Sequence, residues 1–338
     1  MKFLSDNTAP ASPEVLAALQ AANQGPARAY GDDDWTRRLD DAFSRYFERP
    51  VRAFPVSTGT AANSLALATL SPPYGAIYAT DAAHVVHDEC GAVELQSGGA
   101  RIVTLPAPDG RLDAAVLARA LGDTVVSVHS PQPAAVTITQ VTECGTVYRP
   151  AQVAAIAGVA HAHGLPLHMD GARFANALAS LRESPAALTW KAGVDVLSFG
   201  ATKNGAINAE AVVFFDTARV HDFELRRKRA AQLLSKMRYA SAQLLACLEG
   251  SFFAAHAARA NHLAARIGAA AGARLLYPAE ANLLFLKLAP AEAASLRTQG
   301  FEFYDWGPPR DGGSRFAVSW DQPEADVDAL CGALHAWS

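Results

Sequence analysis

Long apolar segments and cysteine motifs are both missing from this chain of 338 residues. No apolar run reaches the roughly 18 residues that a membrane-spanning helix needs, so we expect no transmembrane segment. The first residues, MKFLSDNTAPASPE, lack the apolar centre of a secretory signal peptide. No CxxC spacing is present, which disfavours a zinc site and a disulfide framework, so we expect buried free thiols and a cytoplasmic protein. The four cysteines are Cys90, Cys144, Cys247 and Cys331.

An excess of positive charge is missing as well. The chain has 29 Lys and Arg residues against 33 Asp and Glu residues, which gives a formal charge of −4, and it has no long basic run. We therefore expect neither a nucleic acid nor a membrane surface as its partner. No G-x-G-x-x-G motif follows a predicted strand, which disfavours a nicotinamide dehydrogenase. With half of its residues hydrophobic and 18% charged, the chain has the composition of a globular enzyme of about two domains.

Predicted strands and helices alternate through the first 245 residues, with short connections between them. This pattern predicts an α/β fold with a doubly wound, mostly parallel sheet. From about residue 251 the pattern changes, which predicts a smaller C-terminal α+β domain. We place residues 1–245, with an N-terminal arm, in the large domain and residues 246–338 in the small one. In the large domain we expect a helix at 35–48 and strands at 51–56, 76–80, 101–105, 124–129, 135–142, 165–170, 194–200 and 210–216.

Two predicted strands in the middle of the chain end in residues that suit a pyridoxal phosphate (PLP) site. The run LPLHMD ends at Asp170, Arg173 follows it, and the run VDVLSFG leads into a small polar loop that contains Lys203. PLP needs a lysine amine that forms a Schiff base, and an acid that pairs with the ring nitrogen so that the ring accepts electrons. Ligands of open α/β sheets gather at the carboxyl ends of strands. We interpret Asp170 as the ring-nitrogen partner, Arg173 as a contact to a cofactor oxygen or phosphate, and Lys203 as the Schiff-base lysine.

Each of these residues also has an ordinary structural explanation. An Asp that follows a strand is often a helix N-cap, and a Lys near a strand end is usually solvated. A cofactor-free α/β binding protein therefore stays open as an alternative. The motif MDGAR followed about thirty residues later by SFGATKNG is more specific than either residue alone, and it favours the PLP enzyme.

The segment STGTAAN, between a predicted strand and an apolar helix, is a candidate cradle for the cofactor phosphate. Its backbone N–H groups and the helix dipole would face the phosphate, Gly59 would allow close approach, and Thr60 would add a hydroxyl. An ordinary capped helix explains the same residues. His84, at another strand end, can place its ring on the face of PLP and can transfer protons, or it can be a surface histidine.

Basic residues in two further places are candidates for contacts with anions. The sequence RRKR, which includes Lys228, and the later Arg238 would be solvated in an isolated chain, but they can also reach a phosphate across a dimer interface. Arg315 opens a short predicted strand and can grip a substrate carboxylate through a bidentate pair. A surface arginine is the alternative for Arg315.

In these segments the chain resembles the threonine aldolase family of PLP enzymes, within fold type I, the aspartate-aminotransferase-like fold. The most specific parts are LHMDGARFANALA and FGATKNG with EAVVFF, and STGTAAN, YGDD and HVVHDECGA add support. The similarity runs from FLSDN near the N-terminus to RFAVSW near the C-terminus, which is nearly the whole chain. With the basic cluster, it leads us to expect a homodimer or a homotetramer with shared active sites.

The resemblance implies a role for each matching position. Lys203 would hold PLP, Asp170 would pair with the pyridinium nitrogen, and Arg173 would contact the O3′ side of the cofactor. His84 would stack on the ring and is the candidate base, directly or through a water. The other implied positions are Gly59 and Thr60 for the phosphate, Lys228 and Arg238 for the phosphate of a neighbouring subunit, Ser5 and Arg315 for the substrate carboxylate, and Tyr30 near the same interface.

The resemblance implies a PLP-dependent aldehyde-lyase that cleaves L-threonine, L-allo-threonine and related β-hydroxy-α-amino acids to glycine and an aldehyde by a retro-aldol reaction, without a metal. A PLP-dependent β-eliminating lyase on the same fold is the alternative. Many family members carry a second active-site histidine in an ENTHN-like segment, where this chain reads TQVTECGTVY, with Glu143 and Cys144. The loop after Lys203 reads NGAINAE instead of the common GLGAPVG, so the chain resembles a divergent subgroup.

Overall fold

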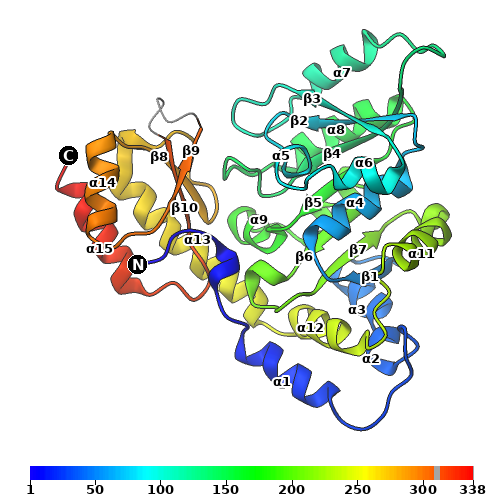
Figure 1. Cartoon of the computed structure of the whole chain (residues 1–338), viewed down its shortest axis with the longest axis horizontal. Coiled ribbons are helices and arrows are strands. Elements are labelled where there is room, and N and C mark those ends of the chain that lie inside the picture. The colour runs from blue at the N-terminus through cyan, green and yellow to red at the C-terminus, as the bar shows by residue number, and fades with distance from the viewer. Residues whose placement is uncertain (308–312, 338) are drawn as a thin grey trace.

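The computed structural model describes residues 1–307 and 313–337, and the chain folds around two sheets (Figure 1). The larger sheet has seven strands in the order β1-β7-β6-β5-β4-β2-β3. Strand β7 runs antiparallel to both of its neighbours, and the other pairs are parallel, so the predicted α/β fold with a mostly parallel sheet is confirmed. The strands are β1 Arg52–Val56, β2 Gly75–Thr80, β3 Arg101–Leu105, β4 Gln132–Thr139, β5 Leu167–Gly171, β6 Val196–Gly200 and β7 Glu210–Phe214.

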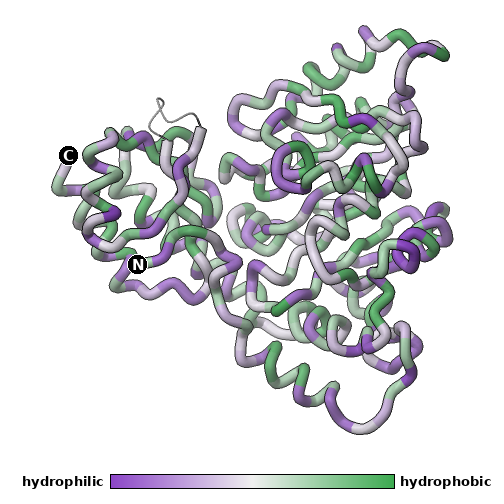
Figure 2. Tube along the Cα trace, in the orientation of Figure 1, coloured by the Kyte–Doolittle hydropathy of each residue, from purple (hydrophilic) through white to green (hydrophobic). Residues whose placement is uncertain are grey.

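Helices cover both faces of this sheet. Side chains alternate along β2, with Ala76 and Tyr78 in one hydrophobic cluster and Ile77 and Ala79 in the other. The strands β5, β6 and β7 are buried along their whole length, as sheets covered on both faces require, and hydrophobic residues follow the central strands (Figure 2). The helices of the large part are α1 Pro13–Ala22, α2 Asp34–Arg37, α3 Leu39–Tyr46, α4 Gly59–Leu70, α5 His84–His87, α6 Ala92–Ser97, α7 Ala114–Gly122, α8 Pro150–Ala162, α9 Phe174–Leu181, α10 Pro185–Leu188, α11 Val220–Arg229 and α12 Arg238–Glu249.

The smaller sheet is antiparallel, in the order β8-β10-β9, and it is packed with three helices. The N-terminal arm joins this part, since Phe3 lies in its hydrophobic core and Lys2 pairs with Glu302. Leu245 lies inside α12 and packs in the large core, so the predicted boundary at residue 245 cuts a helix. The elements are β8 Leu283–Lys287, β9 Tyr304–Trp306, β10 Gly313–Ala317, α13 Phe252–Ala271, α14 Pro290–Thr298 and α15 Glu324–His335.

Three sequence-based expectations were wrong in detail. Residues 124–129 form turns instead of a strand, and Val125, Val126 and Val128 are exposed. β-Branched residues favour a strand only where they can pair with a neighbouring strand and be half-buried. Strand β2 already pairs with β3 on one edge and with β4 on the other, so it has no free edge for this segment. The helix expected at 35–48 is divided into α2 and α3. All four cysteines are free as expected, but Cys90 is exposed and Cys331 is only half-buried.

Among the described residues, no helix is long and apolar enough to cross a membrane.

Candidate active site

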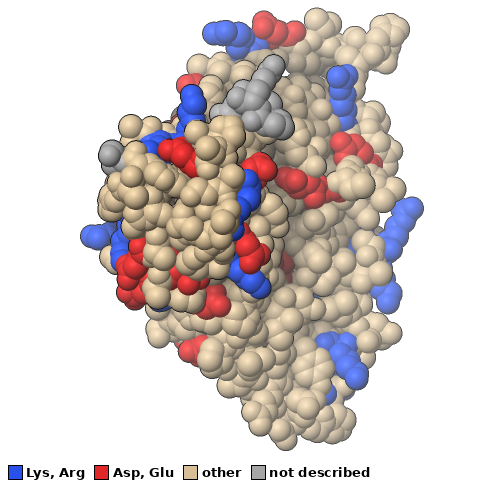
Figure 3. All heavy atoms as spheres, turned by 60° about the vertical axis from the view of Figure 1, so that its left-hand side comes forward, with Lys and Arg blue, Asp and Glu red and all other residues tan. Residues whose placement is uncertain are grey.

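A cavity of about 670 Å³ lies where the large sheet, the small sheet and the N-terminal arm meet. In the space-filling view the boundary between the two parts is hollowed, and both acidic and basic side chains lie beside it (Figure 3). Five of the predicted site residues line this cavity, which are Ser5, His84, Arg173, Lys203 and Arg315.

Lys203 and Asp170 come from the ends of adjacent strands. Strands β5 and β6 pair in parallel with Asp170 opposite Ser198, and Lys203 follows β6 in the short 3-10 helix Thr202–Asn204. Burial lowers the pKa of the Lys203 amine, and the charge of Arg173 lowers it further, while Asp6 and Asp170 act in the opposite direction. A lysine with a lowered pKa is more often uncharged, which is the form that attacks an aldehyde.

A chain of hydrogen bonds connects Asp170 to His84. Asp170 is buried, and its Oδ2 accepts a hydrogen bond of 2.8 Å from Nδ2 of Asn63. Asn63 also donates to Oε1 of Glu89 at 2.9 Å, and this oxygen lies 2.9 Å from Nδ1 of His84. The hydrogen bond with Glu89 raises the pKa of His84, which favours the protonated imidazole. The acid predicted for the ring nitrogen and the histidine predicted for the ring face therefore belong to one network.

Arg173 lines the cavity, but its guanidinium is already paired. Its Nε and Nη2 donate to the two carboxylate oxygens of Asp6 at 2.6 and 2.9 Å. The Asp6 carboxylate also accepts a hydrogen bond of 3.1 Å from Asn282. The contact of Arg173 with a cofactor oxygen stays a prediction, and in this structure the residue ties the N-terminal arm to the end of β5.

Ser5 and Arg315 both line the same cavity, as a shared carboxylate site requires. Ser5 caps the first 3-10 helix, because its hydroxyl accepts a hydrogen bond from the backbone N–H of Asn7 at 3.2 Å. Arg315 lies on β10, and burial followed by the charge of Arg173 lowers its pKa. The guanidinium carbon of Arg315 lies 5.9 Å from the centre of the Tyr304 ring, and none of the ion pairs between described residues involves Arg315, so its N–H groups are available to a carboxylate.

The start of α4 is placed to reach the same region. The hydroxyl of Thr58 caps the helix by accepting a hydrogen bond from Ala61, so the helix begins with Gly59 and Thr60. Asn63, one turn after Gly59 and therefore on the same helix face, donates to Asp170. Gly59 and Thr60 do not line the cavity, and their contact with a phosphate stays a prediction.

Tyr30, Lys228 and Arg238 lie outside the cavity of their own chain. Tyr30 is 54% exposed and lines a separate cavity of about 450 Å³, and Nζ of Lys228 lies 4.5 Å from the centre of its ring. Arg238 donates to the backbone oxygen of Gly25 at 2.9 Å. Their predicted contacts are with a neighbouring subunit, so these positions neither support nor contradict the roles, which stay predictions.

Four residues of the site carried no assigned role in the sequence interpretation. The only sequence signal for three of them was that they lie in motifs shared with the family: Asp6 in FLSDN, Asn63 in STGTAAN and Glu89 in HVVHDECGA. Glu143 was noted only as the residue that stands where other members have a histidine, yet it lines the cavity. Burial raises its pKa to about 7.

Several known proteins that are similar to this chain are threonine aldolases. The model of the β-eliminating lyase family matches residues 2–290. A low-specificity L-threonine aldolase of Pseudomonas sp. (strain NCIMB 10558) is 44% identical over 99% of this chain and 97% of the relative. A protein of the same name from Pseudomonas aeruginosa is 44% identical over 95% of this chain and 93% of the relative. A solved threonine aldolase structure from Leishmania major superposes with a TM-score of 0.93 at 29% identity, and the match covers 99% of each chain.

The chain belongs to the threonine aldolase family of β-eliminating lyases. The family and its cofactor, PLP, were both predicted from the sequence, and both predictions are confirmed. A serine palmitoyltransferase of Sphingomonas wittichii shares the fold alone, with a TM-score of 0.72 at 17% identity over 99% of this chain and 86% of that one.

The residues that line the cavity, together with those packed next to it, fit PLP. Lys203 offers an amine with a lowered pKa, and Asp170 offers a buried carboxylate at the next strand end. The hydroxyl of Thr202, the side-chain oxygen of Asn63 and Oε2 of Glu89 are buried without a hydrogen-bond partner in the same region. Unpartnered buried polar atoms mark a place where a polar ligand is expected.

Proposed function

We propose that this PLP-dependent lyase cleaves L-threonine, L-allo-threonine and related β-hydroxy-α-amino acids to glycine and an aldehyde by a retro-aldol reaction. The observation that carries the proposal is one cavity lined by Lys203 and by Arg315, whose guanidinium has no ion pair among the described residues, with Asp170 buried at the adjacent strand end. The names of the two Pseudomonas relatives support the same substrate class.

The residues of the chain would bind and orient the substrate. When bound, PLP supplies a conjugated system that accepts the electron pair of a broken bond at the α-carbon. Lys203 would hold the cofactor, Asp170 would keep the ring nitrogen protonated through a charge-assisted pair, and His84 would cover the ring. Arg315, with Ser5, would hold the substrate carboxylate so that the bond between the α- and β-carbons stands perpendicular to the ring, which selects that bond for cleavage.

We also propose that active sites are shared between subunits of a homodimer or homotetramer in the cytoplasm. The family resemblance assigns Tyr30, Lys228 and Arg238 to an active site, and none of them lines the cavity of its own chain, so these roles would require a neighbouring subunit. A light-scattering mass above that of the 35.6 kDa chain supports the proposal, and a monomeric mass of the active, PLP-bound protein contradicts it.

A β-eliminating lyase is the second candidate, because the matching family model carries that description. A product assay separates the two functions. Incubation of the purified, PLP-loaded protein with L-threonine and L-allo-threonine should yield glycine and acetaldehyde. Pyruvate and ammonia from serine or a cysteine analogue, without glycine from either threonine isomer, would overturn the retro-aldol proposal in favour of elimination.

A further inference from the structure

Glu143 lines the cavity, and only one of its two carboxyl oxygens accepts hydrogen bonds. Its Oε1 accepts two hydrogen bonds of 2.8 Å, from the backbone N–H of His84 and from the hydroxyl of Thr139. Its Oε2 is buried and has no hydrogen-bond partner in the described part of the chain. The side chain is thus fixed by one oxygen, and the second oxygen stays available to a ligand of the cavity.

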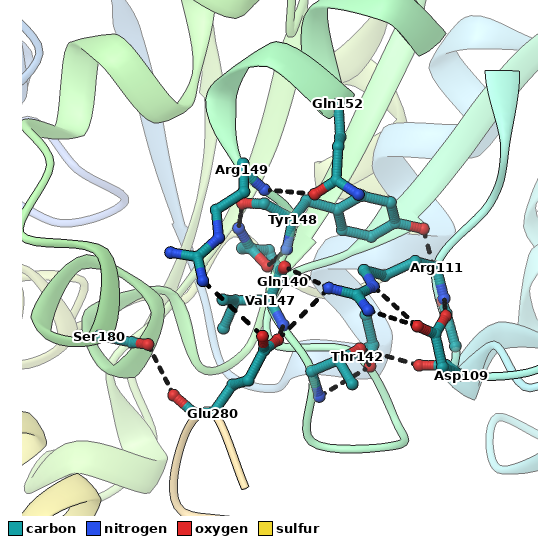
Figure 4. A network of polar contacts seen from close by, with 12 residues as sticks. Asp109, Arg111, Gln140, Thr142, Val147, Tyr148, Arg149, Gln152, Ser180 and Glu280 are labelled. Carbon is teal, nitrogen blue, oxygen red and sulfur yellow. Dashed lines mark hydrogen bonds and ion pairs between the residues drawn. The ribbon is translucent and has the colours of Figure 1, made fainter. Parts of the chain in front are cut away.

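Several hydrogen bonds hold the turn that carries Glu143. The hydroxyls of Thr142 and Thr146 lie 2.8 Å apart across it, and Thr146 donates to the backbone oxygen of Asp109 at 2.8 Å. Beside the turn, the carboxylate of Glu280 accepts a hydrogen bond of 2.8 Å from the backbone N–H of Val147 (Figure 4). Since Glu280 comes from the segment before β8, the turn is tied to the small part as well as to the large sheet. A site that positions one carboxyl group through so many contacts gives it a defined place relative to a ligand.

We propose that Glu143 is a catalytic residue that removes the proton of the substrate's β-hydroxyl during carbon–carbon cleavage and returns it in the reverse reaction. The inference rests on the proposed retro-aldol function. Lys203, Asp170 and Arg315 account for the cofactor and the substrate carboxylate, which leaves the β-hydroxyl as the substrate group without an assigned partner.

The step is balanced within the substrate, the cofactor and Glu143. The β-hydroxyl proton passes to Oε2 of Glu143, and the O–H electron pair forms the second bond of the aldehyde carbonyl. The bond between the α- and β-carbons breaks, and its electron pair stays on the glycine fragment, which the bound cofactor stabilises. A proton from solvent is added at the α-carbon and gives glycine, and the proton on Glu143 returns to solvent, so the protons balance.

The charge states of the two candidate bases favour Glu143 over His84. Burial, opposed by the hydrogen bond from Thr139, raises the pKa of Glu143 to about 7, so the carboxylate is available near neutral pH and has enough basicity to accept a proton. The hydrogen bond to Glu89 raises the pKa of His84, and a protonated imidazole has no lone pair for a proton. Asp170 adds to the raised pKa of Glu143, and the other charged or titratable groups of the cavity are His87, Asp88, Arg173, Lys203, Tyr304, Asp305 and Arg315.

The substitution Glu143→Gln tests the proposal in the PLP-loaded enzyme. Glutamine keeps the shape and the two hydrogen bonds to Oε1, but its amide cannot take a proton. We expect kcat for threonine cleavage to fall about 100-fold or more, which is the usual effect of removing a general base. Exchange of the α-hydrogen of glycine in deuterated water, followed by NMR, needs the cofactor and the carboxylate site but no β-hydroxyl, and should persist. Glu94→Gln is the matched control, since Oε2 of Glu94 is also buried without a partner but the residue does not line the cavity.

Two further readouts separate catalysis from a structural role. In the wild type, kcat/KM for threonine should rise with pH through a limb near pH 7, and this limb should be absent in Glu143→Gln. An infrared difference spectrum between the wild type and Glu143→Gln should show a protonated carboxyl band that disappears over the same pH range. Unchanged threonine cleavage in the variant, or an equal loss of cleavage and glycine exchange, would overturn the role of Glu143. If the wild type exchanges glycine but cleaves no β-hydroxy-α-amino acid, the proposed function itself fails.

Discussion

Asp6 and Arg173 form a two-point ion pair between the N-terminal arm and the segment that follows β5, with Oδ2–Nε at 2.6 Å and Oδ1–Nη2 at 2.9 Å. The Asp6 side chain is only 2% exposed, and that of Arg173 is 11% exposed. Asn282, just before β8, donates to the same carboxylate. One buried carboxylate therefore joins the arm, the large sheet and the small sheet at the edge of the cavity.

This ion pair predicts a pH-dependent effect of Asp6→Asn on stability. Burial alone raises the pKa of Asp6, but the charges of Arg173 and Lys203 and the hydrogen bonds outweigh it, so the pKa falls from 3.8 to about 2. A lowered folded-state pKa stabilises the protein above pH 3.8, and this stabilisation is lost as the pH falls toward about 2. We expect Asp6→Asn to lower the free energy of unfolding by about 2 kcal/mol at neutral pH, with a smaller difference at about pH 3.

Urea unfolding at the two pH values measures this effect. Asp32→Asn is the control, because Asp32 pairs with Arg28 and Arg37 at the surface and its loss should leave the midpoint unchanged. A difference between wild type and Asp6→Asn that is the same at both pH values would show that the ion pair is not the cause.

Much of the large sheet was predictable because its central strands are buried on both faces. The segments that form β5 and β6 are continuous apolar runs ended by polar loops, and a buried parallel strand leaves that signature in the sequence. The segment 124–129 has the same β-branched character, but no strand edge pairs with it. Pairing is a property of the whole sheet, so local composition could not exclude the segment.

The site was predictable only where its residues belong to local motifs. Lys203 and Asp170 follow apolar runs directly, and strand ends are where ligands bind in this type of sheet. The partner of Arg173 is 167 residues away in the sequence, and Asn63 and Asp170 are 107 residues apart. Such contacts leave no periodic pattern, and the function of Glu143 depends on which of its two oxygens has a partner, which only the folded structure reveals.

Lys203→Ala should abolish covalent attachment of the cofactor and turnover. The imine absorbance band of the purified, PLP-loaded protein should disappear, and glycine formation from threonine should fall to background, because no other amine occupies this position at the end of β6. Lys191→Ala is the control, since Lys191 pairs with Glu48 at the surface and does not line the cavity. An unchanged absorbance band in Lys203→Ala would refute the assignment of the lysine.

Arg315→Lys should weaken substrate binding while it keeps the positive charge. Lysine cannot form the bidentate pair with a carboxylate, so we expect kcat/KM for threonine to fall about 10-fold to 100-fold, mainly through a higher KM. Steady-state kinetics measure the change. Arg266→Lys is the control, because Arg266 pairs with the exposed side chains of Glu324 and Asp328 and does not line the cavity. Kinetic constants of Arg315→Lys equal to those of the wild type would remove Arg315 from the carboxylate site.

Gly145→Ala should disturb the turn that positions Glu143. Gly145 has a φ of +79°, and an added Cβ would lie 2.7 Å from the backbone oxygen of Leu283 on β8, closer than such atoms approach. Either the turn or β8 must shift, so we expect a loss of about 1–3 kcal/mol in unfolding free energy and slower threonine cleavage. Gly164→Ala is the matched control, since Gly164 also has a positive φ, of +70°, but a Cβ there meets nothing within 4 Å. Thermal unfolding and threonine kinetics are measured for both variants. Both variants carry the strain of a positive φ, but only Gly145→Ala has the close contact with Leu283. Equal effects in both variants would show that the turn does not depend on that contact.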